Sequence, residues 1–363
     1  MTPYDLHLNP AAFTTRFPSW HVRFGAGASR DLPEILDGLN ARRVMFVATR
    51  SGVERYAGVA EVLGERCVAT FDGALPHCPE TVAHEALSLL LRSNAEAVVT
   101  VGGGSTIGIG KFIQASTGRP HVCLPTTLSG SEMTPLYGVK VAAEKRTRTD
   151  PQARPKVVIA DPELAASLPG SEVVATGMNC LAHCVEALYP PQPAPLTSLL
   201  ALQGVRTLAR ALPGRLADPG DMGHVEAAMY AGLVGGMLVA LVGIGFHHKI
   251  CHAIGGMSDV AHGDSNAVML PHVLAFNAPA IPAAMAALAE ALGADSAPEG
   301  VHALARALGA PHSLRDLGVP ERVLPAMAAY SVKTTPYNPR PVDFESTLAL
   351  LRRAWAGHPP SAA

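Results

Sequence analysis

The stretch Val101-Gly-Gly-Gly-Ser-Thr-Ile-Gly-Ile-Gly-Lys111 follows a predicted buried strand, Ala97–Val101, and opens a predicted helix. The three glycines at its start carry no Cβ, so a phosphate could contact the backbone N–H groups of the turn. The N-terminus of the following helix would add a partial positive charge. A glycine cluster can also be ordinary turn chemistry, and this one is neither the GxGxxG fingerprint nor a GxxxxGKS/T loop. The candidate cofactor contacts of this loop are Gly102, Gly103, Gly104, Ser105 and Lys111.

A second, hydroxyl-rich loop follows the next predicted strand, His121–Pro125. Its sequence, Leu124-Pro-Thr-Thr-Leu-Ser-Gly-Ser-Glu132, offers hydroxyl groups that could hydrogen bond to a ribose, a phosphate or a nicotinamide amide. Such residues are also common in turns. Two loops of this kind after consecutive strands favour a dinucleotide site, and the candidate contacts of the second loop are Thr126, Thr127 and Ser131.

Two further β-branched runs, Arg43–Thr49 and Lys156–Ala160, complete the strand signals of the first 160 residues. Strands that alternate with helix-length segments predict βαβ units and a mainly parallel sheet. After Asp161-Pro-Glu-Leu, which is typical of a helix start, the chain is rich in Ala and Leu. We therefore predict an α/β dinucleotide-binding domain over residues 1–161 and an all-helical substrate domain over 162–363. A ligand cleft is expected between them, where the carboxyl ends of the strands meet the helices.

Composition excludes several classes of protein. A formal net charge of −2 over 363 residues argues against a protein that binds nucleic acid through its charge. The longest apolar stretch, Ala227–Phe246, is rich in glycine and predicts a close-packed buried helix rather than a membrane span. The N-terminus does not resemble a signal peptide, and the six cysteines form no CxxC pair. We expect a cytoplasmic protein with reduced thiols.

The histidines suggest a second cluster of functional residues. His248 and His252 are four residues apart, which places them on one face of a helix, and Asn179 and His183 have the same spacing upstream. His262 follows before a glycine. With 15 histidines in the chain, any single one is more often structural than functional. Two such pairs together with His262 favour a site.

The two loops together resemble the cofactor-binding half of the iron-containing alcohol dehydrogenases, whose sheet is similar to that of dehydroquinate synthase. In that family an acidic residue after the first strand often holds the adenosine ribose. Here Thr49-Arg50-Ser51 stands at that point, without a carboxylate. The resemblance therefore implies a dehydroquinate synthase-like fold and the use of NADH or NADPH, with Thr49 and Arg50 among the cofactor contacts.

The histidine cluster resembles the metal site of the same family. Asn179, His183, His248 and His262 match its four metal-ligand positions, while His252 matches a histidine beside the substrate. The family has an Asp where this chain has Asn179, and a neutral amide is a poorer ligand for a divalent cation. Three histidines and a water can still hold Zn²⁺. We expect that the site is vestigial and that no metal is resident.

Within this superfamily the chain is similar to the maleylacetate reductases over nearly its whole length. The shared segments are Thr176–Tyr189, His247–Gly256, Leu270–Ala280, Pro336–Val342 and Trp355–Pro359. Ser265 and Asn266 depart from the residues expected there. The resemblance implies a homodimer that reduces the conjugated C=C of maleylacetate, a small dicarboxylate, to 3-oxoadipate in the degradation of aromatic compounds.

The implied reaction assigns roles to the cluster. Hydride addition to the alkene would place negative charge on the ketone oxygen, which hydrogen-bond donors can stabilise in place of a metal. His252 and His248 are the candidate donors and proton source. The candidate substrate contacts are Asn179, His183, Lys249, His262 and Arg340.

Two other enzyme classes stay open at this stage. One is a metal-dependent alcohol dehydrogenase that acts on a simple carbonyl, which stoichiometric zinc or iron would favour. The other is a lyase of the dehydroquinate synthase type that uses NAD transiently, which would show no net consumption of NADH. A cofactor-binding protein without catalytic activity is the third alternative.

Overall fold

The computed structural model describes residues 15–76, 78–141 and 144–361. The N-terminal residues that we judged unlike a signal peptide therefore lie outside the described part. The chain forms two compact units, of which the first spans Pro18–Leu168 and the second begins at Pro169. The division falls after Leu168, whereas the sequence placed it after residue 161, so the short helix α7 (Pro162–Ala165) belongs to the first unit.

The first unit contains a six-stranded sheet in the order β1-β8-β5-β4-β2-β3, and every pair of neighbours is parallel. The mainly parallel sheet expected from the sequence is confirmed. Its strands are β1 (Val22–Phe24), β2 (Val44–Val47), β3 (Cys67–Phe71), β4 (Ala97–Gly102), β5 (His121–Pro125) and β8 (Val157–Ala160). The two edge strands, β1 and β3, were not predicted, because their residues are partly exposed and lack a continuous apolar run.

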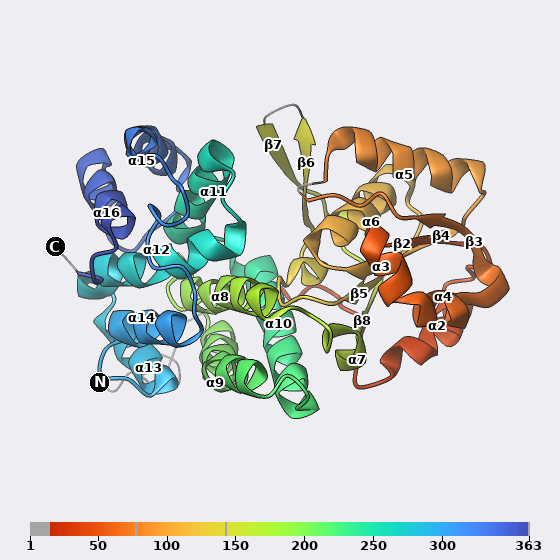
Figure 1. Ribbon diagram of the computed structural model, residues 1–363, viewed down its shortest axis with the longest axis horizontal. Helices are drawn as coiled ribbons and strands as arrows, with labels where there is room; N and C mark the ends of the chain where they lie inside the picture. Colours follow the sequence, from red (N-terminus) through yellow and green to blue (C-terminus); the bar gives the residue numbers. More distant parts are fainter. Residues whose placement is uncertain (1–14, 77, 142–143, 362–363) are drawn as a thin grey trace. The chain divides into compact units, whose positions relative to one another are not determined.

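Helices cover both faces of this sheet, as Figure 1 shows. Side chains of β2 alternate between two cores: Val44 and Phe46 join the core on one face, and Met45 and Val47 join the core on the other. This two-residue period is the consequence of the pleated strand. The helices of the unit are α2 (Leu32–Gly38), α3 (Arg50–Arg55), α4 (Ala57–Leu63), α5 (Glu80–Arg92), α6 (Gly104–Thr117) and α7.

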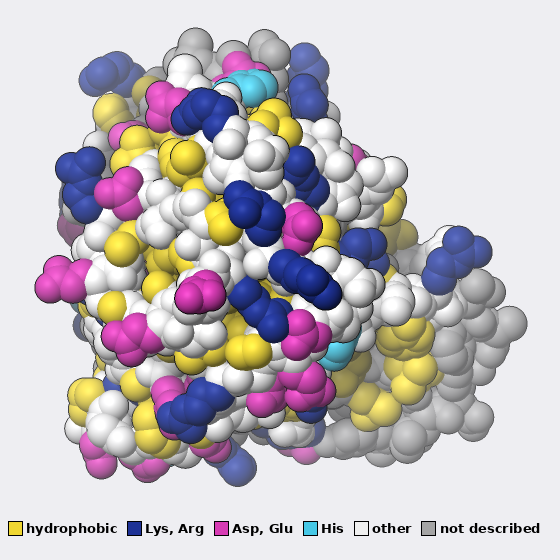
Figure 2. All heavy atoms as spheres, turned by 90° about the vertical axis from the view of Figure 1, so that its right-hand side faces the viewer, with side chains coloured by type: hydrophobic (Ala, Val, Ile, Leu, Met, Phe, Trp, Pro, Cys, Tyr) yellow, Lys and Arg dark blue, Asp and Glu magenta, His cyan; other side chains and the backbone are white. Residues whose placement is uncertain are grey.

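An antiparallel hairpin, β6 (Leu136–Val141) and β7 (Glu144–Thr149), follows the second loop. This hairpin was not predicted, because its second strand, Glu-Lys-Arg-Thr-Arg-Thr, contains no apolar residue. Figure 2 shows one face of the molecule, on which basic and acidic side chains are interspersed. This mixture agrees with the net charge of −2.

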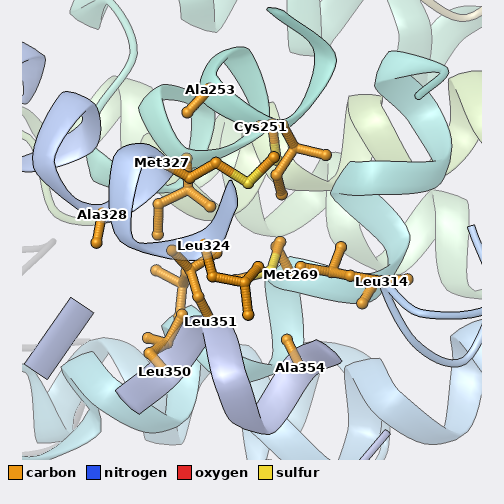
Figure 3. Close-up of a cluster of buried hydrophobic side chains, with 14 of the residues drawn as sticks. Cys251, Ala253, Met269, Leu314, Leu324, Met327, Ala328, Leu350, Leu351 and Ala354 are labelled. Carbon is orange, nitrogen blue, oxygen red and sulfur yellow. The ribbon is translucent and has the colours of Figure 1, made fainter. Parts of the chain in front are cut away.

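In its described residues the second unit is built from helices, as the sequence predicted. They are α8 (Gly170–Glu186), α9 (Pro195–Ala217), α10 (Met222–Val242), α11 (Phe246–Ser258), α12 (His262–Asn277), α13 (Pro282–Leu292), α14 (Ala297–Ala307), α15 (Leu324–Thr334) and α16 (Phe344–Ala356). Figure 3 shows one of the cores, where Cys251, Met269, Met327 and Leu351 from four different helices come together.

Helix α10 corresponds to the apolar stretch noted in the sequence. By length and composition it is the one described helix that could cross a membrane, but 61% of its most apolar window is buried inside the protein. It packs closely on α8, since a Cβ added at Gly235 would lie 2.7 Å from the Cys180 sulfur. The interpretation as a close-packed core helix is confirmed. The helix ends at Val242 because Gly243 has a positive φ of 79°.

Candidate active site

The glycine-rich turn connects β4 to α6, as predicted. Gly102 has a φ of +139°, a conformation that favours glycine. A Cβ added at Gly103 would lie 2.8 Å from the Thr127 methyl group, so the absence of a side chain lets the two loops touch. A Cβ at Gly104 would meet no atom within 4 Å. Gly104, at the first position of α6, is therefore open to an approaching ligand, while the glycines before it serve the close packing of the turn.

The two predicted cofactor loops lie side by side because β4 and β5 are neighbours in the sheet. The backbone N–H of Thr126 donates to Gly102 O at 3.1 Å. Thr127 Oγ1 is buried and has no hydrogen-bond partner in the described structure. A buried hydroxyl without a partner is costly. Its position against the turn therefore suits a hydrogen bond to a bound ligand. Ser105 lies partly exposed one residue after Gly104.

Lys111 does not have the position expected from the sequence. Its side chain is fully buried, and Nζ donates to Thr134 Oγ1 at 3.0 Å, to Leu136 O at 2.7 Å and to the backbone oxygen of Ser131. Burial lowers the pKa of Lys111 to about 7. The predicted direct contact with a cofactor is corrected, because the ammonium group is used inside the protein to hold the loop that starts at Ser131.

At the end of β2, Thr49 caps helix α3 by accepting the Gly52 N–H at 3.1 Å. The Arg50 side chain is 93% exposed, and its Nε lies 3.8 Å from Asp72 Oδ2. Asp72 follows β3 directly and was missed by the sequence analysis, which did not predict that strand. An acidic side chain therefore accompanies Arg50 at the position where the resemblance implies a ribose.

The second unit brings the predicted histidine cluster together from three helices. The His183 ring of α8 lies 4.8 Å from the His248 ring of α11, measured between centroids. His262, at the start of α12, lies 5.8 Å from His248 and 5.5 Å from His252. Burial lowers the pKa of His183 and of His248 well below the usual value, and the neighbouring histidines lower both further.

Glu186 is a member of this cluster that sequence reasoning did not single out. Its buried carboxylate accepts His248 Nδ1–H at 2.6 Å and the backbone N–H groups of Gly245 and His247, each at 2.9 Å. The available signal was its position three residues after His183 on the same helix, which places both side chains on one face.

Asn266 is a second such residue. Its Oδ1 accepts His247 Nε2–H at 2.7 Å, and its Nδ2 donates to His262 O at 2.6 Å and to Asn179 Oδ1 at 3.4 Å. It therefore connects α12 with α11 and α8. From the sequence, Asn266 was only a departure from the expected pattern.

Arg340 and Lys249 were predicted to contact the substrate, and the structure shows their contacts within the protein. Arg340 donates from Nη1 to Phe276 O at 3.0 Å, and its Cζ lies 4.2 Å above the Phe276 ring. Lys249 follows His248 on α11 and is half-buried, and its charge contributes to the lowered pKa of His248. A contact of either residue with a substrate stays a prediction.

Comparison with known proteins identifies the family. The model of the iron-containing alcohol dehydrogenases matches residues 18–162, and that of the C-terminal part of the same family matches residues 173–355. The chain belongs to the iron-containing alcohol dehydrogenase family. The family membership expected from the sequence, and with it the fold class, is confirmed.

Individual members of this family resemble the chain over nearly its full length. The maleylacetate reductase of Pseudomonas aeruginosa is 38% identical over 96% of this chain and 99% of its own. The crystal structure of maleylacetate reductase from Agrobacterium tumefaciens superimposes with a TM-score of 0.92 at 35% identity, over 96% of this chain and 100% of the other. That of the enzyme from Rhizobium sp. strain MTP-10005 gives 0.91 at 36% identity, over 96% and 99%.

The name of the family implies a metal, and the donor set of this chain does not fit one. Among the residues that the structure describes, no group of three or more His, Cys, Asp or Glu side chains is arranged to hold a metal ion. At the position where the family has a carboxylate, the Asn179 oxygen accepts a hydrogen bond from Asn266. A neutral amide also brings no charge to balance a divalent cation.

Proposed function

We propose that this chain is a maleylacetate reductase that reduces the C=C bond of maleylacetate to give 3-oxoadipate, with NADH or NADPH as the reductant. The observation that carries this proposal is the 38% identity to a protein of that name over 96% of the chain. The match covers both loops of the first unit and the histidine helices of the second.

The chemistry suits a site of imidazole and amide groups. The substrate is an alkene conjugated to a ketone, and bound NAD(P)H supplies the hydride to the alkene carbon that is β to the ketone. Negative charge then develops on the ketone oxygen. The α carbon takes one proton to complete the product. A conjugated acceptor needs less activation than a simple carbonyl, so hydrogen-bond donors suffice.

We assign the donor and proton-source roles to His252 and His248. An imidazole N–H group can donate a hydrogen bond to the developing charge, and the ring can relay a proton. The substrate also carries two carboxylates, which need donors or cations. Asn179, His183, Lys249 and His262 provide such groups on α8, α11 and α12.

We propose that the enzyme works without a resident metal. The support is Asn179, whose oxygen is occupied by Asn266 in the structure. We further propose that it accepts both cofactors, because Arg50 offers a guanidinium for a 2′-phosphate and Thr49 has no charge to repel it. A cytoplasmic homodimer that binds only small molecules is the form that we expect.

The decisive experiment is the oxidation of NADH, followed by absorbance, with maleylacetate as substrate in the presence and absence of EDTA. We expect turnover in both conditions and 3-oxoadipate as the product by mass spectrometry. Reduction of simple aldehydes or ketones, but not of maleylacetate, with a need for zinc or iron would favour the alcohol dehydrogenase instead. Conversion of substrate without net NADH consumption would point to the lyase.

A further inference from the structure

The Glu186 carboxylate is an unusual cap for a helix, because it comes from a different helix. It ends α8 and accepts the N–H groups of Gly245, the N-cap residue of α11, and of His247 in the first turn of α11. The N-cap residue itself, Gly245, has no side chain that could make such a bond. A carboxylate at this point also interacts favourably with the helix dipole. Glu186 thus attaches the start of α11 to the end of α8.

The same carboxylate has a third partner, the ring of His248. Nδ1 of that ring lies 2.6 Å from Glu186 Oε2, and both side chains are at least 96% buried, with exposures of 2% and 4%. Oε2 already accepts the Gly245 N–H, so the bond to the ring is best made by an Nδ1–H donor. The geometry therefore selects the Nδ1–H tautomer and commits that side of the ring to Glu186.

The opposite side of the ring has no partner. His248 Nε2 is buried and makes no hydrogen bond in the described structure. The rings nearest to His248, measured between centroids, are those of His183 at 4.8 Å, His247 at 5.1 Å and His262 at 5.8 Å. A buried polar atom without a partner costs on the order of 1–3 kcal/mol, so such atoms are retained where a ligand completes them.

We propose that Glu186 is a positioning residue for the reduction, which holds the His248 ring so that Nε2 is the atom presented to the substrate. Because Nδ1 is committed to Glu186, Nε2 is the ring atom left to contact the substrate, and the bond to Glu186 keeps the ring in this orientation during the reaction. This inference rests on the proposed function.

A substitution at Glu186 can separate a positioning role from a capping role. Replacing Glu186 by Gln keeps the shape but replaces one carboxylate oxygen by an NH₂ group. An NH₂ group in place of Oε1 loses the bond from the His247 N–H, and one in place of Oε2 loses the bonds from Gly245 and from the His248 ring. In either case the ring loses the negative charge beside Nδ1. A role in capping alone would lower stability and leave turnover in the folded protein unchanged.

The test uses full-length protein labelled with ¹⁵N in its histidines. In the wild type we expect the His248 ring, assigned by comparison with His248→Gln, to show a protonated Nδ1 and a bare Nε2. A proton on Nε2 alone would overturn the proposal, even if no Glu186 variant folds. This measurement needs no substrate, so it is independent of the proposed function.

The kinetic arm compares Glu186→Gln with Asp221→Ala. Asp221 also caps a helix with its carboxylate, by accepting the Gly223 N–H at 2.8 Å at the start of α10. We expect both variants to melt at lower temperature than the wild type. Only Glu186→Gln should lower kcat, by about tenfold to a hundredfold, with KM for maleylacetate changed less than about threefold. An unchanged kcat in folded Glu186→Gln overturns the inference. A wild type inactive with maleylacetate overturns the proposed function instead.

Discussion

Asn266 on α12 donates its amide N–H to Asn179 Oδ1 on α8 across 3.4 Å. The amide oxygen of Asn266 meanwhile accepts His247 Nε2–H at 2.7 Å. Because these two bonds fix which end of the Asn266 amide faces α8, the oxygen of Asn179 is the end that faces Asn266. The NH₂ group of Asn179 is thereby turned away, and the residue that replaces the family's carboxylate is presented as a hydrogen-bond donor.

Removal of metal should therefore have little effect. We expect enzyme dialysed against EDTA to keep at least half of its kcat, because Asn179 supplies no carboxylate and that of Glu186 is already bonded to three N–H groups. Elemental analysis before and after dialysis checks the metal content. About one zinc or iron per chain, with activity lost on chelation and restored by the metal, would contradict this expectation.

Asn179→Asp should change that behaviour. A carboxylate next to three imidazoles supplies both a better ligand and the missing negative charge, so the affinity for Zn²⁺ should rise at least about tenfold, equivalent to roughly 1.4 kcal/mol. Titration calorimetry with Zn²⁺ measures it. Asn338→Asp is the control, since Asn338 pairs with Asn277 instead of with a member of the histidine cluster and should gain no metal. Equal affinities in the two variants would argue against a vestigial site.

His252→Ala tests the donor assigned to the developing enolate. Its kcat should fall by about a hundredfold or more, since one such donor contributes on the order of 3 kcal/mol in the transition state. KM for maleylacetate should change much less. The control is His312→Ala, an exposed histidine in the same unit, which should leave kcat intact. If folded His252→Ala retains most of its kcat, His248 becomes the leading donor.

Cofactor choice should be permissive, with kcat/KM for NADH and NADPH within roughly tenfold of each other, a difference of less than about 1.4 kcal/mol. Arg50→Ala should reduce kcat/KM for NADPH about tenfold and leave that for NADH nearly unchanged, because only NADPH has a 2′-phosphate. Asp72→Asn should favour NADPH, since the carboxylate lies 3.8 Å from Arg50 and competes with the phosphate. A thousandfold preference for NADH would show that Asp72 dominates over Arg50.

Lys111 should make stability depend on pH. Burial lowers its pKa to about 7 from the usual value of 10.5, so the unfolded chain binds more protons between these values. The free energy of unfolding should therefore gain from Lys111 as the pH rises from about 7 toward 10.5, by at most about 1.4 kcal/mol per unit. Burial also raises the pKa of Glu132 to about 7, so Glu132 changes the free energy of unfolding at pH values below this range.

Lys111→Met removes this contribution. We expect urea unfolding between pH 7 and 9 to show a flatter dependence on pH than in the wild type. Overall stability should also be lower, because the oxygens of Ser131, Thr134 and Leu136 lose their donor. Exposed Lys333→Met is the control. The same slope in wild type and Lys111→Met would show that the buried amine does not titrate in this range.

Local sequence determined the order of the elements in this protein. The central strands β2, β4, β5 and β8 were predictable because each is a continuous buried run, and burial on both faces demands apolar residues throughout. The glycine turn before α6 was predictable because backbone conformation there depends on the missing Cβ. The pairs His248–His252 and Asn179–His183 followed from helical periodicity alone.

Other features depend on contacts between segments far apart in the chain, and only the tertiary structure decided them. Lys111 has the composition of a phosphate ligand but is buried, because the chain after Ser131 folds back over α6 and supplies its acceptors. The pairing of Glu186 with His248, and of Asn266 with Asn179, joins residues 62 and 87 positions apart. A hydrogen bond depends on distance and direction in space, and neither is encoded in spacing along one helix.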